Sequence, residues 1–255
     1  MVLIIILIIV WILLIVYIYR KRKNRIKGVV VIPHMEELLE STIPFYQTLN
    51  QEKRLEFNKR VQKFIASKRF TPINCVLTDQ DKVLIAAGAM IPIFNFPEYY
   101  YPELSEILIY PGAFNKDYEY AGKERNILGM VGDRQELKSS LFLSLTAMRQ
   151  GFSNSKDGRN VVIHEFLHLL DGDDSKIDGM PDSLLGHQYS IPFIELIRKE
   201  MKKVGSNKSI LDSYAGTNPA EFFAVAGELF FEKPTKMEKN HPELYEMLKK
   251  VFKQD

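Results

Sequence analysis

The stretch NVVIHEFLHLLDG, residues 160–172, contains the pattern H-E-x-x-H, in which His164 and His168 flank Glu165. It begins with an asparagine, a typical helix N-cap, ends with a glycine, a typical helix stop, and has no proline or glycine between them. The stretch therefore predicts one helix. Residues four apart on a helix are neighbours, so the two imidazoles project together and can bind one metal ion. Glu165 is turned by about 100° from His164, close enough to reach a water on the metal without being a ligand.

A catalytic zinc site usually has three protein ligands and an open fourth position, so a third ligand is needed. The stretch 211–234, LDSYAGTNPAEFFAVAGELFFEKP, provides a candidate. Asn218, Pro219 and Glu221 predict a helix start, and in a capping box the Glu221 carboxylate would be used for capping. Against that alternative, the helix is apolar on nearly all sides, and Glu221 and Glu228 share one face of it. Buried carboxylates need a partner, so we prefer Glu221 as the third ligand and place Glu228 behind the ligands or at the rim.

The sequence gives less support to other residues as the third ligand. In the longer pattern H-E-x-x-H-x-x-G-x-x-H, position 171 would be glycine and position 174 histidine, but this chain has Asp171 and Asp174. Asp174 lies in a polar stretch that predicts a loop. Asp171, three residues after His168, either accepts a ring N–H from a ligand histidine or bonds to backbone or solvent; both readings stay open. The remaining histidines are expected at the surface or at helix starts: His34, His187 and His241.

The N-terminal region differs from the rest of the chain. Residues 2–19 form a run of 18 residues without a charge, followed by six Lys or Arg residues within 20–27. A run of this length is close to the minimum that crosses a bilayer, and the charges follow it instead of preceding it, which argues against a secretory signal peptide. We therefore expect a single-pass protein of the inner (cytoplasmic) membrane with its catalytic domain in the cytoplasm. The expected domains are a transmembrane anchor at 1–19, a basic linker at 20–35 and a metallopeptidase domain at 36–255.

Composition excludes several classes of protein. The chain has 255 residues, 46% hydrophobic and 26% charged, as in ordinary globular proteins. Its net charge of +2 depends on the basic cluster, and the remainder has more acidic than basic residues, which argues against nucleic-acid binding. The cluster fits a position next to anionic lipid. With one cysteine, Cys75, the chain has no intramolecular disulfide framework.

The remaining patterns predict a mixture of helices and strands in one domain. Residues 36–70 are helical in pattern, 82–94 are apolar throughout and fit a helix or a buried strand, and 107–110 predict a short strand. Residues 138–145, KSSLFLSL, predict another strand. This strand lies either at the sheet edge, where an extended peptide could pair with it, or in the core.

The chain resembles the Mlc titration factor A family of zinc peptidases, whose catalytic core is related to that of anthrax lethal factor. The resemblance covers roughly residues 40–252 and rests on VVIHEFLHLLDG, LDSYAGTNPAEFFAVAGELFFEKP, LIAAGAMIPIF, IYPGAF and HPELYEMLKKVF. It implies an α+β, zincin-like fold of the gluzincin type with a small mixed sheet and one Zn²⁺ per chain. The zinc ligands would be His164, His168 and Glu221, with Glu165 as the general base and Tyr214 facing the substrate carbonyl.

The expected function is hydrolysis of peptide bonds in a peptide or protein substrate, with aminopeptidase and endopeptidase activity both open. Glu165 would take a proton from a zinc-bound water and pass it to the leaving amine, and Tyr214 would hydrogen-bond to the oxyanion. One alternative is a membrane-tethered protein that sequesters a cytoplasmic transcriptional regulator with little or no turnover. Glu165 would have no use in such a protein. Another is a zinc hydrolase that acts on substrates other than peptides, which would use the same ligands.

Overall fold

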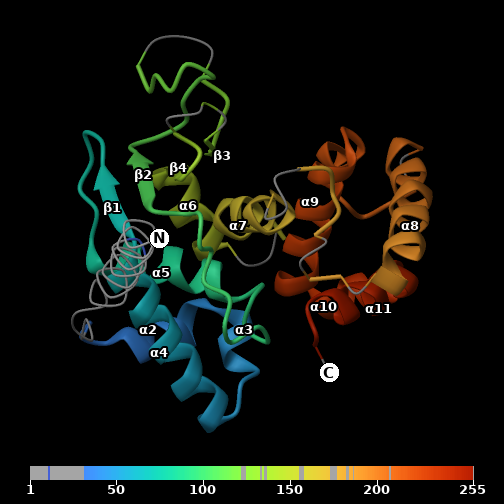
Figure 1. Ribbon diagram of the computed structural model, residues 1–255, viewed down its shortest axis with the longest axis horizontal. Coiled ribbons are helices and arrows are strands. Elements are labelled where there is room, and N and C mark those ends of the chain that lie inside the picture. The colour runs from blue at the N-terminus through green and yellow to red at the C-terminus, as the bar shows by residue number, and fades with distance from the viewer. Residues whose placement is uncertain are drawn as a thin grey trace, which may run out of the picture.

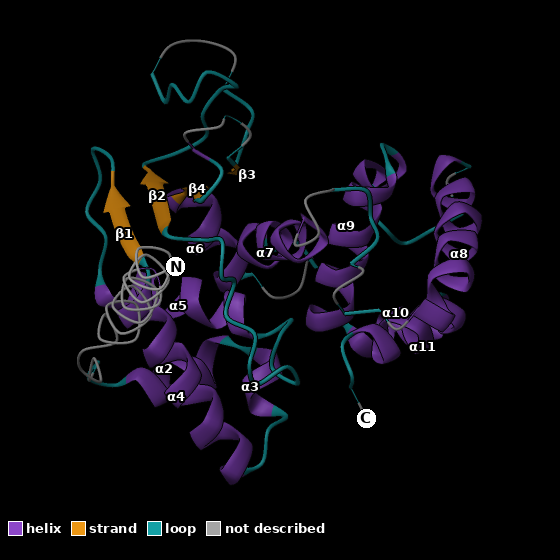
Figure 2. Cartoon of the chain, in the orientation of Figure 1, coloured by secondary structure: helices purple, strands orange, loops and turns teal. Residues whose placement is uncertain are grey.

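The structure, a computed structural model, describes most of the chain after residue 31. The described residues are 11, 32–121, 125–132, 134, 137–154, 158–172, 177–181, 184–185, 187–206 and 208–254. Figure 1 shows one small sheet with helices below it and to its right, and Figure 2 shows that the strands are confined to one side of the molecule. This arrangement confirms an α+β fold with a small sheet.

The sheet is mixed and has the strand order β1-β2-β4-β3. Its strands are β1 (Arg69–Pro72), β2 (Glu106–Tyr110), β3 (Gly129–Val131) and β4 (Ser140–Ser144). β2 pairs in parallel with both β1 and β4, whereas β3 pairs antiparallel with β4. The strand predicted at 107–110 is thus confirmed as β2.

The strand predicted at 138–145 is confirmed as β4, but the hypothesis that it forms the sheet edge is wrong. β4 lies between β2 and β3, and each of its residues is buried. Its two neighbours occupy its backbone hydrogen bonds, so a peptide cannot pair with it. Among the described residues, β3 is the edge strand next to the H-E-x-x-H helix.

The N-terminal helices form one layer of the core. They are α2 (Met35–Thr42), α3 (Pro44–Gln47), α4 (Gln51–Ser67) and α5 (Asp79–Met90). The helical pattern predicted for 36–70 is confirmed, and Phe57, Val61 and Phe64 on α4 are completely buried. The stretch 82–94 is a helix up to Met90, because a capping box between Thr78 and Asp81 starts α5 before the apolar run begins.

Two central helices hold the candidate ligands. α6 (Leu145–Ser153) leads to α7 (Val161–Asp171), and α9 (Pro219–Glu232) packs against α7. In Figure 1, α7 lies in the middle of the molecule, between the sheet with α5 and α6 on one side and α9 on the other. The side chain of Asn160 accepts hydrogen bonds from the backbone N–H groups of Val162 and Ile163, as expected for an N-cap. The predicted H-E-x-x-H helix is therefore confirmed.

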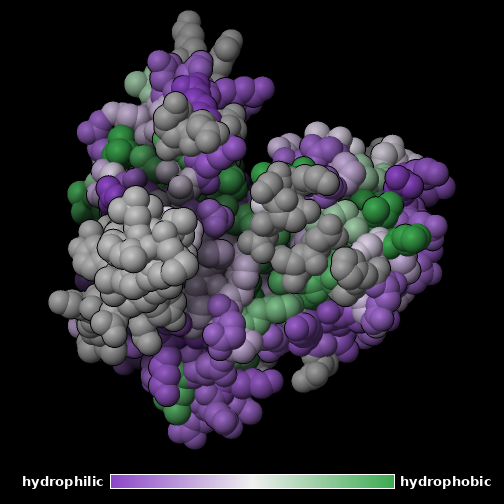
Figure 3. Space-filling model, viewed as in Figure 1, coloured by the Kyte–Doolittle hydropathy of each residue, from purple (hydrophilic) through white to green (hydrophobic). Residues whose placement is uncertain are grey.

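The C-terminal helices pack around α9. They are α8 (His187–Gly205), the 3₁₀ helix η3 (Ser213–Gly216), α10 (Pro234–Asn240) and α11 (Pro242–Val251). A buried pair joins two of these segments: Nδ1 of His241, between α10 and α11, is 2.6 Å from Oε2 of Glu200 on α8. In Figure 3, hydrophilic side chains cover the α4 end of the visible face, and hydrophobic ones gather towards α8 and α9.

The predicted localisation, a single-pass protein of the inner membrane, is corrected by the structure. Throughout the part of the chain that is described, no helix is both long enough and apolar enough to cross a bilayer. α8 is the longest at 19 residues but contains several charged side chains, and the more apolar α9 has 14 residues, whereas a span takes about 20. The predicted anchor at 1–19, apart from Trp11, and the linker up to residue 31 lie outside the described residues.

Candidate metal centre

Three potential ligand atoms from α7 and α9 converge on one point. Nε2 of His164 is 3.1 Å from Nε2 of His168 and 3.1 Å from Oε2 of Glu221, and the remaining distance, from His168 Nε2 to Glu221 Oε2, is 3.3 Å. A tetrahedral ion with ligands at about 2.0–2.1 Å places neighbouring ligand atoms about 3.3 Å apart. The three residues form a group that could hold a metal ion, and the triangle has the size that such an ion requires.

The carboxylate of Glu228 orients the first histidine. Its Oε1 lies 2.7 Å from Nδ1 of His164, and its Oε2 accepts a hydrogen bond of 2.5 Å from the backbone N–H of Asn160. Because a carboxylate oxygen only accepts, Nδ1 of His164 carries the proton, and in the neutral ring Nε2 then has the lone pair that a metal needs. Burial alone would lower the pKa of His164, but in the metal-free protein the hydrogen bonds to Glu221 and Glu228 raise this pKa well above its ordinary value.

Glu221 lies at the start of α9 without acting as a cap. The side chain of Asn218 caps the helix by accepting a hydrogen bond of 2.9 Å from the backbone N–H of Glu221. The Glu221 carboxylate points instead to His164 and His168, so the capping box considered from the sequence is not formed. Burial would raise the pKa of Glu221, but the two imidazoles hold it well below its usual range.

Glu165 is buried beside the three ligand residues and faces the edge strand. Its side chain is 5% exposed, and burial raises its pKa above the ordinary value. A β-carbon added to Gly129 on β3 would lie 2.6 Å from both Cγ and Oε1 of Glu165. The glycine thus leaves the space that the carboxylate occupies. The sequence analysis missed Gly129, because only the contact between β3 and α7 reveals its role.

Tyr214 lies next to the ligand residues on η3. The centroid of its ring is 6.3 Å from that of His164, and the residue is 52% exposed. Burial of the hydroxyl, together with the charge and hydrogen bond of Glu221, raises the pKa of Tyr214 to about 12. The phenol is therefore protonated at neutral pH and can donate a hydrogen bond.

Asp171 binds the backbone, one of the two alternatives left open by the sequence, and does not accept a ring N–H from a ligand histidine. Its Oδ2 accepts a hydrogen bond of 2.8 Å from the backbone N–H of Gly179, so the carboxylate fastens the segment that follows α7. Its Oδ1 and the Nδ1 of His168 are both buried, and neither has a hydrogen-bond partner among the described residues. Burial raises the pKa of Asp171 to about 6.

Among the described side chains, His34 and His241 lie outside the group of ligand residues. His34 is exposed and pairs with Glu37, and His241 is bound to Glu200. Asp174 lies outside the described residues, and His187 is the first residue of α8.

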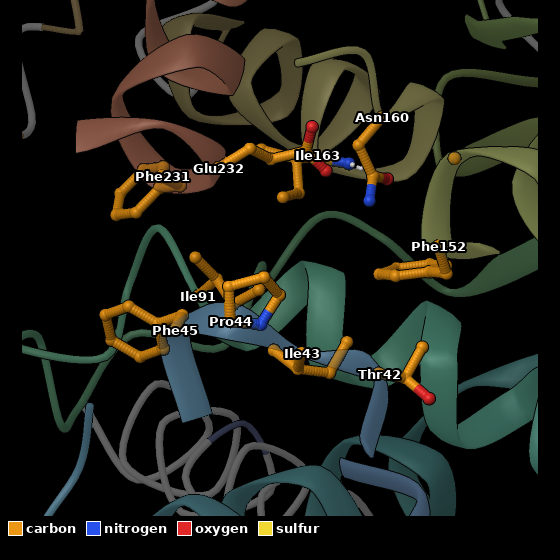
Figure 4. A pocket seen from close by; sticks show the side chains of 11 residues that line it. Thr42, Ile43, Pro44, Phe45, Ile91, Phe152, Asn160, Ile163, Phe231 and Glu232 are labelled. Atoms are coloured by element: carbon orange, nitrogen blue, oxygen red, sulfur yellow. Dashed lines mark hydrogen bonds between the residues drawn. The ribbon is translucent and has the colours of Figure 1, made fainter. Parts of the chain in front are cut away.

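A small apolar pocket lies next to α7 but does not contain the ligand residues. Asn160 and Ile163 at the start of α7 face it, together with side chains from α2, α3, α6 and the end of α9. Figure 4 shows that its walls are formed mainly by apolar side chains, among them Phe45, Phe152 and Phe231. The metal centre is therefore separate from this pocket.

The fold and the group of metal-ligand side chains define the class of protein, a metallopeptidase-like α+β domain. The sequence matches the family described as Glucose-regulated metallo-peptidase M90 over residues 18–253, and the chain belongs to this family. The family resemblance inferred from the sequence motifs is thus confirmed.

Similar proteins match over most of their length. The uncharacterized protein slr2042 of Synechocystis is 32% identical over 231 residues, which cover 86% of this chain and 83% of that protein. Mlc titration factor A of Pectobacterium atrosepticum is 27% identical over 228 residues, 84% of each chain. Mlc titration factor A of Escherichia fergusonii is 28% identical over 239 residues, 88% of this chain and 86% of its own.

Proposed function

We propose that this chain is a zinc-dependent peptidase, that residues 36–255 form its catalytic domain, and that it binds one zinc ion per chain. The observation that carries the proposal is the triangle of ligand atoms from His164, His168 and Glu221 next to a buried carboxylate, Glu165. Zinc accepts this ligand set of two imidazoles and one carboxylate, and three protein ligands leave a position for water. A purely structural zinc site usually has four Cys or His ligands, whereas this chain has one cysteine.

The protein supplies the proton transfers and the orientation of groups around the ion. Zinc, when bound, provides a Lewis acid that makes water more acidic and polarises a carbonyl. Glu165 takes the proton of the attacking water and delivers it to the leaving amine, and burial, which raises its pKa, makes it a better base. Glu228 keeps His164 in the tautomer whose Nε2 is available as a ligand.

Tyr214 stabilises the oxyanion that forms on the attacked carbonyl. Its phenol stays protonated at neutral pH, since the pKa is raised to about 12, so it can donate a hydrogen bond to the developing negative charge. Loss of one such donor typically lowers the rate by about 10²–10³. Its side chain is 52% exposed and contacts the ring of His164, so a substrate can reach the phenol from the solvent side.

The substrate is an extended peptide that pairs with the edge of β3. This strand pairs with β4 on one side, and Gly129 brings its backbone directly over Glu165. No described strand pairs with the other side of β3, and a peptide added there would place its backbone carbonyls next to the general base.

The test is peptide hydrolysis by the full-length, zinc-loaded protein compared with Glu165→Gln. Peptides with free and with blocked N-termini distinguish aminopeptidase from endopeptidase activity. We expect turnover by the wild type that the variant lacks, with the same zinc content in both. Equal inactivity of the two proteins with zinc bound would contradict the proposal.

A second candidate function is binding of a transcriptional regulator. It is favoured by the name of two similar proteins, Mlc titration factor A. Calorimetric titration of purified Mlc into the Glu165→Gln variant tests it, because binding without turnover needs no general base. If the Glu165→Gln variant binds Mlc as tightly as the wild type does, and the wild type hydrolyses no peptide, this function is favoured over the peptidase.

A further inference from the structure

Tyr214 lies on a helix that is too short to fix its position by itself. The residue lies on η3, a 3₁₀ helix of only four residues, and its side chain is 52% exposed. Short 3₁₀ segments have poor hydrogen-bond geometry and little rigidity of their own. A hydrogen-bond donor to a transition state must nevertheless be held in place before the reaction. Contacts outside η3 must therefore position this tyrosine.

The carboxylate of Asp212 provides such contacts through both of its oxygens. Oδ1 accepts a hydrogen bond of 2.8 Å from the backbone N–H of Tyr214 and caps η3. Oδ2 forms an ion pair with the guanidinium of Arg159. The side chain of Asp212 is 24% exposed and that of Arg159 is 72% exposed, so solvent screens much of the attraction between them, and the hydrogen bond to the Tyr214 amide is the stronger of the two contacts.

Arg159 belongs to the segment that also supports the metal ligands. It directly precedes Asn160, which caps α7 and whose backbone N–H binds Glu228. Glu228 in turn binds His164. Two adjacent residues, 159 and 160, thus hold the turn that carries Tyr214 and the carboxylate that orients a ligand histidine.

We propose that Asp212 and Arg159 are positioning residues that hold the phenol of Tyr214 over the metal centre. The ion pair ties η3 to the N-terminal end of α7, and the cap fixes the backbone of Tyr214 relative to Asp212. Neither residue is one of the three ligands, and the contacts that the proposal invokes run from Arg159 to Asp212 and from Asp212 to the backbone of Tyr214. The inference rests on the proposed function only in assigning a catalytic use to the tyrosine.

The first test measures structure without relying on activity. Hydrogen exchange of the Tyr214 amide reports its bond to Asp212 directly, and we expect Asp212→Ala to speed this exchange about fivefold or more, the equivalent of losing a helix cap. Asp212→Asn keeps an oxygen that can cap η3 but loses the charge. The exchange rate of the Tyr214 amide in this variant should therefore lie between the rates in the wild type and in Asp212→Ala. Asp117→Asn is the matched control, since Asp117 pairs with Arg134 on the surface away from the site. Unchanged exchange in Asp212→Ala would overturn the proposal.

The second test is a double-mutant cycle in peptide hydrolysis by the full-length zinc-loaded protein. We expect Asp212→Ala to lower kcat about fivefold with little change in KM, and Arg159→Lys to retain more activity than Arg159→Gln. In a Tyr214→Phe background, Asp212→Ala should lower kcat no further, because the group that it positions is absent. Equal losses in both backgrounds would contradict a role through Tyr214. If the wild type hydrolyses no peptide, the peptidase proposal fails, and hydrogen exchange of the Tyr214 amide in the Asp212 variants still decides whether Asp212 positions the turn.

Discussion

At the scale of single residues, the site depends on buried carboxylates that have different neighbours. Glu228 is bound by a ring N–H and a backbone N–H, Asp171 is bound by Gly179, and Glu165 lies against the backbone of β3. A buried carboxylate is stabilised as an anion only to the extent that such groups compensate for its lost hydration. Two single substitutions test these environments.

Gly129→Ala should impair the proposed base without removing the metal. The new β-carbon would lie 2.6 Å from Cγ and Oε1 of Glu165 and would displace the carboxylate. We expect kcat to fall at least about tenfold, since a correctly placed general base contributes about 10²–10⁴, while zinc content stays the same. Gly112→Ala is the control, because nothing lies within 4 Å of a β-carbon there. If both variants are as active as the wild type, Gly129 does not position Glu165.

Asp171→Asn should change how the stability of the metal-free protein depends on pH. The folded pKa of about 6 lies above the ordinary value of 3.8, so Asp171 contributes most stability below about pH 4 and loses that contribution as pH rises through 6. An asparagine does not titrate and can still accept the hydrogen bond from Gly179. The difference in the free energy of unfolding, variant minus wild type, should increase by up to about 3 kcal/mol from pH 4 to pH 7.5, as measured by urea unfolding. The same difference at both pH values would contradict a raised pKa.

At the scale of secondary-structure elements, the site is a contact between α7 and α9. His164 and His168 lie on α7, and Glu221 and Glu228 lie on α9, so the triangle of ligand atoms exists only if the two helices pack at the right distance. Gly227 sets that distance, because a β-carbon there would lie 2.5 Å from Cδ1 of Leu167, which is completely buried.

Gly227→Ala should therefore weaken both the fold and the metal centre. Overpacking typically costs about 1–3 kcal/mol, and a shift of α9 would enlarge the triangle of ligand atoms. We expect a lower unfolding temperature and a weaker zinc affinity in competition with a chelator. Gly205→Ala on α8, where a β-carbon has no neighbour within 4 Å, should leave both unchanged. A normal zinc affinity in Gly227→Ala would mean that Leu167 absorbs the methyl group without moving α9.

At the scale of the whole molecule, metal binding and folding are linked, because the ligands come from helices far apart in the sequence. His164 and Glu221 are 57 residues apart and meet only in the folded chain. A metal that binds this site stabilises the folded state relative to the unfolded one, in which the ligands are dispersed.

Zinc removal should lower the unfolding temperature. A free zinc concentration a thousandfold above Kd stabilises the fold by about 4 kcal/mol, which corresponds to a shift of about 10 °C for a chain of this size. Calorimetry with and without a chelator measures the shift. His168→Ala should show almost no shift, whereas His34→Ala, whose side chain is exposed, should show the full one. A full shift in His168→Ala would place the zinc elsewhere.

Much of the fold could be predicted from the sequence, because its signals are local. The caps at Asn160 and Asn218 mark where α7 and α9 begin, and apolar residues spaced three or four apart mark the buried face of α4. The convergence of His164 and His168 follows from the spacing of one helical turn.

The rest depended on which segments meet in space. The sequence left open whether Glu221 caps its helix or turns to the histidines, whether Asp171 binds a ligand or the backbone, and whether β4 lies at the edge or inside the sheet. Packing of α9 against α7 decides the first, the fold of the segment after α7 back onto Asp171 decides the second, and pairing of β3 with β4 decides the third.

The sequence by itself determined the two helices, the pair of histidines on one of them and the family to which the chain belongs. Backbone hydrogen bonds and caps act between residues up to four apart, so these features are encoded locally. Only the tertiary structure decided that Gly129 lies over Glu165, that Glu228 orients His164 and that Arg159 reaches Asp212. Each of these is a contact between segments brought together by burial of the shared core, and such contacts leave no periodic pattern in the sequence.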